Sequence, residues 1–396
     1  MRWLLGVASV VMCLALLAGV ACGGGAGKEE GVKEVKLGVG LPLSGIYGAF
    51  IGIPVKQGLE LAADYIGEFT VDGQRYKWNI IFEDSGIDSA GGVASATKLI
   101  FEDGVKLMTQ IYTTPAMAAQ TLCEESGVIV FSTFPLEALG PDNPYSFMGM
   151  VSPELPAATL MKYISEERPE VKTASAIGDD TSTTRQLIGC LKTAAEYNGI
   201  EWLEAEYVPS DTVEFYPVAA KMMTKDPDLC YIPHQAVGPM REMGWEGTSF
   251  YSLWGKSFGD QYGWGNFQGH LSYYPEPMGE ELPEPIKEIA ADYQQQFGAE
   301  FTLMSFHYVI QLCYLTDALK KAGTVDDVDQ IVATLETGTF DTPIGTIWFG
   351  LGEMDDIGHL LITPCWIGEI RSEEYHRVFE VSANEAEALV LEIFAE

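Results

Sequence analysis

The sequence predicts an α/β protein with two domains, each built on a doubly wound parallel sheet. Strand-like and helix-like segments alternate along the chain, and the alternation starts again after about residue 150. Strands that alternate with helices form parallel sheets whose faces the helices cover. About 370 residues follow Cys22, which is more than one compact core usually holds. We therefore expect two domains.

The segments before residue 150 give the first domain its elements. Their composition predicts strands at 35–39, 77–82, 105–108 and 128–131, and helices at 56–66, 89–101 and 114–127. Thr114 is expected to be the N-cap of the last helix, with Pro115 at the first helical position and Gly127 at its end.

The segments after residue 150 give a second set of strands and helices. The predicted strands are 173–177, 202–208 and 229–232, and the predicted helices are 185–197, 215–224, 286–297 and 306–322. Residues 344–370 are predicted to be strands joined by glycine turns. Proline-rich stretches at 141–153 and 275–285 mark places where the chain could pass between the domains.

The N-terminus predicts export from the cytoplasm. A positive start at Arg2 precedes an uncharged apolar run, 4–20, and the small residue Ala21. This pattern is that of a cleaved signal peptide over residues 1–21, followed by a glycine-rich linker over 22–34. The run is at the lower edge of the length that spans a bilayer, and its flanks suit cleavage better than a permanent helix.

Cys22 stands at the predicted cleavage point and resembles the lipidated cysteine of bacterial lipoproteins. Gly19 departs from that pattern, because leucine is usual three residues before the cysteine. We expect a lipid-anchored protein outside the cytoplasmic membrane. The alternative is a cleaved, soluble secreted protein.

Charge and cysteine content exclude several classes of function. The formal net charge of −34 argues against binding to nucleic acid or to an anionic lipid surface. The mature chain has five widely spaced cysteines and no C-x-x-C pair. Because their number is odd, we expect buried free thiols and no disulfide framework: Cys123, Cys190, Cys230, Cys313 and Cys365.

Several short motifs follow one another along the chain, beginning with the segment 35–45, VKLGVGLPLSG, and with Glu83-Asp84-Ser85 before an alanine-rich helix. Their order resembles that in the substrate-binding lipoproteins of ABC importers of the branched-chain amino acid (Leu/Ile/Val) type, and the segment 35–45 resembles the opening of these proteins. Further matches follow in order at Gly104-Val105-Lys106, Gly127-Val128-Ile129 and 343–347, PIGTI. No single motif is diagnostic, but together they span about residues 35–370.

The resemblance implies a type I periplasmic-binding-protein clamshell, with two lobes joined by three crossings and the ligand between them. Lobe 1 would comprise residues 35–150 plus 275–348, and lobe 2 residues 151–274 plus 349–396. The implied partners are a small-molecule ligand and the transmembrane subunits of an ABC permease. We expect a monomer that touches the membrane only through its lipid anchor and needs no cofactor or metal.

Candidate binding residues of lobe 1 follow its predicted strands. Thr113 and Thr114 stand before a helix whose free N–H groups and dipole favour a carboxylate, and the resemblance assigns the ligand carboxylate to this loop. Ser132 and Phe134 follow the next strand, although Phe134 is bulky where the family has small residues. Tyr47 and Phe50, on the first loop, are candidates for an aromatic wall. Plain N-capping and loop packing are the alternatives.

Candidates in lobe 2 follow its strands in the same way. Thr183 stands where the family often has an aromatic residue. His234 and Gln235 follow the strand at 229–232, and each offers a hydrogen bond. Arg185 is expected to pair with Asp179 or Asp180, or else to reach an anion in the cleft.

Trp254 lies where the amino-acid binders typically place a carboxylate for the ligand ammonium. In this chain the segment 251–258 has no acidic residue, and the next one along the sequence is Asp260. Either another carboxylate replaces it, or the ligand carries no ammonium, because an unpaired buried ammonium is costly. The aromatic residues of 251–264 would then form a ligand wall, or else fill the core of lobe 2. We favour a small organic acid, such as an aromatic acid, over an amino acid.

No catalytic motif supports an enzyme. The sequence has no G-x-S-x-G and no H-E-x-x-H, and its five histidines show no metal-ligand spacing. We expect a binding protein. A ligand sensor working through a receptor, or a hydrolase with an unrecognised site, is the alternative.

Overall fold

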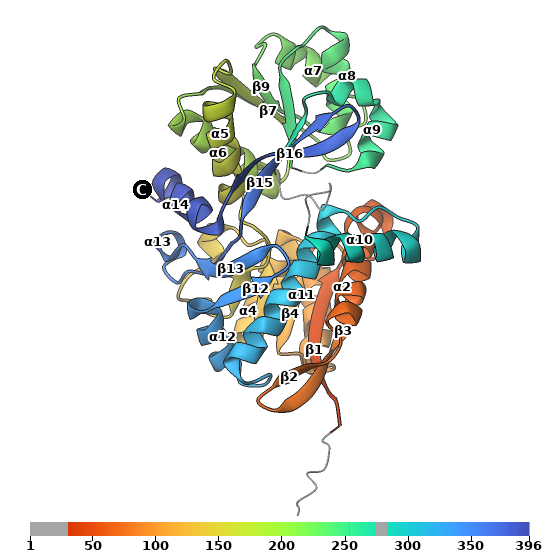
Figure 1. The fold of residues 1–396 in the computed structure, drawn as a ribbon, viewed down its shortest axis with the longest axis vertical. Helices are drawn as coiled ribbons and strands as arrows, with labels where there is room; N and C mark the ends of the chain where they lie inside the picture. The colour runs from red at the N-terminus through yellow and green to blue at the C-terminus, as the bar shows by residue number, and fades with distance from the viewer. Residues whose placement is uncertain (1–30, 253, 274–282, 396) are drawn as a thin grey trace, which may run out of the picture. The chain divides into compact units, whose positions relative to one another are not determined.

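Three β-sheets organise the chain in the computed structural model, which describes residues 31–252, 254–273 and 283–395. The six-stranded sheet has the order β2-β3-β1-β4-β5-β6, the seven-stranded sheet β16-β15-β11-β10-β9-β7-β8, and a small sheet β12-β13-β14 (Figure 1). The central strands of both large sheets are parallel. The predicted doubly wound architecture is therefore confirmed.

The six-stranded sheet is built mainly from the first part of the chain. Its strands are β1 Lys33–Leu41, β2 Phe69–Val71, β3 Gln74–Asp84, β4 Leu107–Gln110, β5 Ile129–Ser132 and β6 Ser146–Met148. The helices beside it are α2 Ile53–Ile66, α3 Ser89–Phe101, α4 Thr113–Ser126, α10 Glu284–Phe297, α11 Leu303–Ala322 and α12 Val328–Thr337. A short helix, α1 Gly45–Tyr47, and a π-helical turn at Gly48–Gly52 precede α2.

The seven-stranded sheet uses the middle of the chain and its end. Its strands are β7 Thr173–Asp179, β8 Glu201–Val208, β9 Leu229–Tyr231, β10 Thr248–Tyr251, β11 Leu271–Ser272, β15 Cys365–Arg371 and β16 Glu374–Val381. Its helices are α5 Glu154–Glu167, α6 Ser182–Tyr197, α7 Tyr216–Met223, α8 His234–Glu242, α9 Lys256–Tyr262 and α14 Ala383–Phe394.

The small sheet joins β12 Thr339–Thr342, β13 Gly345–Gly350 and β14 Leu360–Ile362, with α13 at Gly352–Asp355. The chain leaves β6 for α5 through residues 149–153, and β14 for β15 through 363–364. The third predicted crossing, at 275–285, falls mostly outside the described residues. The lobe limits stay predictions.

Both large sheets repeat one strand arrangement that positions a binding site. In the six-stranded sheet, β3 lies on one side of β1, and β4 and β5 follow on the other side. In the seven-stranded sheet, β8 lies on one side of β7, and β9 and β10 follow on the other side. The direction in which strands are added therefore reverses between β1 and β4, and between β7 and β9. Loops leaving the carboxyl ends of strands at such a point diverge and leave a crevice. The segments after β1, β4 and β7 are therefore the places to look for a ligand.

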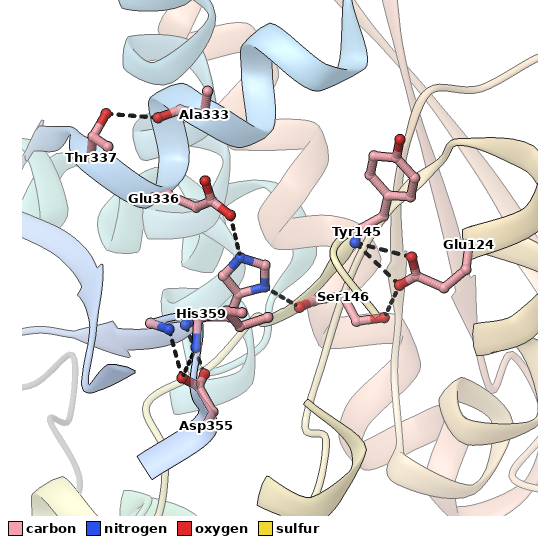
Figure 2. A network of polar contacts seen from close by, with 10 residues as sticks. Glu124, Tyr145, Ser146, Ala333, Glu336, Thr337, Asp355 and His359 are labelled. Atoms are coloured by element: carbon pink, nitrogen blue, oxygen red, sulfur yellow. Dashed lines mark hydrogen bonds and ion pairs between the residues drawn. The ribbon is translucent and has the colours of Figure 1, made fainter. Parts of the chain in front are cut away.

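A buried polar network ties strand β6 to the residue before β14 (Figure 2). The His359 ring stacks on Phe147, with centroids 3.6 Å apart, and its Nδ1 donates to the Ser146 carbonyl at 2.7 Å. Its Nε2 lies 3.2 Å from Glu336 Oε1. The Asp355 carboxylate accepts the His359 backbone N–H at 2.8 Å. The start of β6 is thus fixed to the residue that precedes β14.

The five cysteines of the described chain are all free. Four are buried and Cys313 is half-buried, so the prediction of free thiols without a disulfide framework is confirmed for them. Burial raises the pKa of the Cys123 thiol to about 12, which keeps it protonated and unreactive.

Candidate functional site

A cavity of about 470 Å³ lies at the carboxyl ends of β1, β4, β7 and their neighbours. The six-stranded sheet contributes residues that follow β1, β4 and β5, and the seven-stranded sheet contributes Asp179, Tyr231 and Tyr251. The first turns of α11 add Leu303 and Tyr308. Most of the lining is apolar or aromatic, as in sites for small organic ligands.

The N-terminus of α4 brings polar groups to this cavity. Thr113 and Thr114 both line it, and the Thr113 hydroxyl donates to the Thr133 carbonyl at 2.8 Å. Among the described residues neither backbone N–H of this threonine pair has a hydrogen-bond partner. Free N–H groups at the start of a 14-residue helix attract an anionic group.

The predicted capping of α4 is wrong. The helix begins at Thr113, its N-cap is Tyr112, no side chain caps it, and Pro115 is its third residue. Thr114 is therefore inside the first turn and leaves its N–H exposed. Tyr112 has a φ of 78°, a backbone conformation that only glycine adopts easily. Such strain is typical of functional sites and turns the chain sharply from β4 into α4.

Aromatic side chains form much of the cavity wall around Thr113 and Thr114. Tyr47 lines the cavity as predicted and packs edge-on against Tyr112, with ring centroids 5.6 Å apart. Across from them Tyr231 and Tyr251 stack at 4.9 Å. Phe134 is also a lining residue, although only 1% of its surface is exposed. The wall suits a flat or apolar ligand body.

Thr183 is a predicted binding residue that lines the cavity and belongs to a helix beside the seven-stranded sheet. It lies in the first turn of α6, and its hydroxyl oxygen is 3.4 Å from that of Thr113. The polar rim of the cavity thus contains groups that follow both β4 and β7.

Two predicted residues of the first domain do not line the cavity. Ser132 is buried, and its hydroxyl donates to the Gln110 carbonyl at 2.7 Å, which joins the ends of β5 and β4. Phe50 is 65% exposed on the π-helical turn. Thr133, beside Ser132, takes the lining position instead, because side chains on a strand end alternate in direction.

Trp254 belongs to a second hydrophobic cluster, His234 packs against that cluster, and neither residue lines the cavity. The His234 ring stacks on Phe258 at 3.8 Å, and Trp254 lies edge-on to Phe267 at 5.1 Å. The sequence left two interpretations of the aromatic residues in 251–264, a ligand wall or a core. Trp254 fills the core. Of the five aromatic residues in this segment, only Tyr251 lines the cavity.

Two further predicted or considered residues, Gln235 and Arg185, are also absent from the cavity lining. Gln235 is exposed on α8 and lies outside the lining. Arg185 binds Asp180, Nε to Oδ1 at 2.7 Å, which confirms the predicted ion pair and leaves it no role in the cavity. Within the cluster, burial lowers the pKa of His270 well below its usual value, so its ring stays neutral while Ser249 contacts its Nδ1 at 2.9 Å.

Sequence reasoning missed three of the five tyrosines and the one charged group of the lining. Tyr112, Tyr231 and Tyr308 line the cavity, as does Asp179. The sequence predicts Asp179 only as a partner for Arg185. Its place at the last residue of β7 was the available signal, because a strand end at a winding reversal faces the crevice.

Within the described ranges, no group of His, Cys, Asp and Glu residues could hold a metal ion. No helix there is both long and apolar enough to cross a membrane. The predicted signal peptide, 1–21, and the predicted lipidation site, Cys22, lie outside the described residues.

Solved structures with the same fold are numerous. An ABC transporter substrate-binding protein from Sphaerobacter thermophilus has a TM-score of 0.75 at 17% identity, covering 89% of this chain and 98% of its own. A leucine-, isoleucine-, valine-, threonine- and alanine-binding protein from Brucella ovis, in a closed conformation, has a TM-score of 0.75 at 16% identity, covering 90% and 97%.

A third structure was solved with a ligand. It is a solute-binding protein of an ABC transporter from Rhodopseudomonas palustris BisB5 in complex with 3,4-dihydroxybenzoic acid, with a TM-score of 0.73 at 18% identity, covering 88% of this chain and 98% of its own. At these identities the likeness establishes the fold. A comparison with curated protein sequences found no match.

The family model for periplasmic binding proteins matches residues 34–374, nearly the whole described chain. Members of this family bind solutes outside the cytoplasm and are not enzymes, which agrees with the expectation of a binding protein. The chain therefore belongs to the periplasmic binding protein family and has its type I fold.

Proposed function

We propose that this protein is the extracytoplasmic solute-binding protein of an ABC importer. It captures a small carboxylate-bearing ligand between two lobes that close on it, and delivers the ligand to a permease. An organic or aromatic acid is favoured, with an amino acid as the alternative. Cys22 anchors the chain to the membrane, which keeps it at high effective concentration near the permease.

One observation carries the proposal: free N–H groups of α4 face a cavity walled by tyrosines. The carboxylate binds at Thr113 and Thr114, where the helix dipole and hydroxyl groups meet it. Tyr47, Phe134 and Thr183 enclose the rest of the ligand. Structural neighbours support this choice, because one was solved with 3,4-dihydroxybenzoic acid and another with benzoate.

A thermal-shift screen of amino acids, aromatic acids and short amides, followed by calorimetry, tests the proposal. We expect aromatic acids to stabilise the protein, since a ligand that binds only the folded state raises its melting temperature. The corresponding amides, which lack the negative charge, should bind more weakly. Tight binding of leucine together with no binding of benzoate-like acids would contradict the preference for organic acids. Equal binding of acids and amides would contradict the carboxylate site.

A further inference from the structure

Asp179 is a carboxylate at the carboxyl end of a strand of the second sheet. It ends β7, next to the winding reversal between β7 and β9, and it lines the cavity. The Thr184 hydroxyl donates a short hydrogen bond to its Oδ1. Among the described residues its other carboxylate oxygen has no hydrogen-bond donor. Asp179 thus offers an acceptor to whatever occupies the cavity.

No protein cation offsets this charge at the described cavity wall. The lining includes no Lys, Arg or His, and Asp179 is its one formally charged side chain. The basic residue nearest in sequence, Arg185, is held by Asp180 and lies over the Tyr207 ring, 3.9 Å from its centroid. A carboxylate with no protein cation beside it leaves a cationic ligand group free to pair with it, and such a charged hydrogen bond is among the stronger ones in proteins.

The tyrosines around Asp179 also favour a cationic ligand group. Five of them line the cavity: Tyr47, Tyr112, Tyr231, Tyr251 and Tyr308. Burial, with the nearby charge of Asp179 adding to it, raises the pKa of Tyr251 to about 12. Burial also raises the pKa of Tyr112, with smaller contributions from Tyr47, Tyr308 and Asp179. These rings therefore remain neutral, and both their faces and their hydroxyl oxygens attract cations.

We propose that Asp179 binds a cationic nitrogen of the ligand, so that the ligand is a zwitterion with its carboxylate at Thr113/Thr114 and its ammonium at Asp179. This inference rests on the proposed function and narrows it to acids that also carry a basic nitrogen. The sequence left two alternatives: another carboxylate binds the ligand ammonium, or the ligand carries no ammonium. This inference selects the first. The segment 251–258 has no carboxylate, and Asp260 is engaged by Trp264 Nε1 at 2.9 Å, so Asp179 is the replacement.

Calorimetry with matched probes tests the assignment on the purified protein and on two variants. One set is 4-methylbenzoate, 4-(aminomethyl)benzoate and 4-methylbenzylammonium, and a second is 3-phenylpropanoate, phenylalanine and 2-phenylethylammonium. The first set keeps one carbon skeleton and varies only the ionic groups, and in the second set 2-phenylethylammonium also lacks the carboxyl carbon. Asp179→Asn removes the charge and keeps the shape. Asp180→Asn, one residue along and outside the lining, removes the same charge as a control.

We expect a zwitterion to bind tightest in at least one set. Asp179→Asn should weaken that binding about 10- to 100-fold, the usual worth of a hydrogen bond to a charged group. It should leave the carboxylate-only probe unchanged, and Asp180→Asn should leave both unchanged. Equal weakening of both probes by Asp179→Asn would overturn the assignment. So would a carboxylate-only probe that binds tightest and ignores the substitution, although the proposed function would then stand. Failure of every carboxylate probe would instead count against the proposed function itself.

Discussion

At the scale of single residues, Thr113 has the most contacts with other polar groups of the rim. Its hydroxyl donates to the Thr133 carbonyl and lies near the hydroxyls of Thr133 and Thr183, at 3.1 and 3.4 Å. One side chain therefore couples the loop after β5 to the start of α6.

Thr113→Val should lower ligand affinity about fivefold, because a hydroxyl group is lost at about 1 kcal/mol net. The shape of the side chain is kept, but the hydrogen bond to the Thr133 carbonyl is lost, so the free energy of unfolding should also fall by about 1 kcal/mol. Calorimetric titration with the tightest aromatic acid measures the effect. Thr97→Val, which removes an exposed hydroxyl bonded to the Val93 carbonyl on α3, is the control. Unchanged affinity in Thr113→Val would exclude Thr113 from the site.

A buried histidine makes stability depend on pH. Burial lowers the pKa of His307 from 6.5 to about 4. The unfolded chain binds this proton more readily, so the histidine's contribution to stability is present above pH 6.5 and is lost as pH falls toward 4. The loss amounts to about 2 kcal/mol at pH 5 by linkage.

His307→Gln should therefore show a smaller fall in the free energy of unfolding between pH 7 and pH 5 than the unmodified protein. Urea denaturation at both pH values measures the difference. His376→Gln, which removes an exposed histidine on β16, is the comparison. Equal falls in the unmodified protein and in His307→Gln would refute the role of His307.

At the scale of elements, the packing of α3 against the first turn of α4 sets the position of the carboxylate site. A Cβ added to Gly92 would lie 2.4 Å from the Pro115 carbonyl oxygen and 2.5 Å from its Cα. Both neighbours are backbone atoms, so they cannot move without shifting the start of α4. Gly92 is needed for this close approach.

Gly92→Ala should lower the free energy of unfolding by about 1–3 kcal/mol, as overpacking does, and should also weaken ligand binding. Thermal denaturation and calorimetry measure the two effects. Gly189→Ala on α6 is a matched control, because nothing lies within 4 Å of its added Cβ. That variant should be neutral or more stable, by up to about 1 kcal/mol, since alanine favours helix. Similar behaviour of the two variants would contradict the packing account.

The elements were largely predictable from the sequence, and the site only partly. Apolar runs bounded by turns located β1, β3 and β7, because buried parallel strands need continuous apolar residues. The start of α4 was misplaced by two residues, since a strained Tyr112 acts as N-cap and no local signal announces it. Helix α14 and strand β16 were not predicted at all.

Composition could not separate a ligand wall from a core. The segment 251–264 contains five aromatic residues, and the structure places Tyr251 in the cavity and Trp254 in a second cluster. That division depends on how β10 and α9 pack against α8, which is long-range information. Asp179 was overlooked for a similar reason: its neighbour Asp180 is the partner of Arg185, and only the fold separates the two carboxylates.

At the scale of the whole molecule, the account requires closure on the ligand. The crossing segments follow β6 and β14, two strands that the His359 network ties to one another, so we expect the segments to bend as a pair beyond Met148 and Ile362. Contacts made by both sheets with one ligand shift the population toward the closed form. Small-angle scattering should show a smaller radius of gyration with saturating ligand. An unchanged radius with every bound ligand would argue against closure.

The most direct measurement is a crystal structure of the protein with the tightest-binding acid from the screen. The account predicts the ligand carboxylate within hydrogen-bond distance of the Thr113 and Thr114 N–H groups, with the ligand body against Tyr47 and Tyr251. A ligand bound elsewhere on the protein, or bound in the cavity with its carboxylate away from α4, would contradict it.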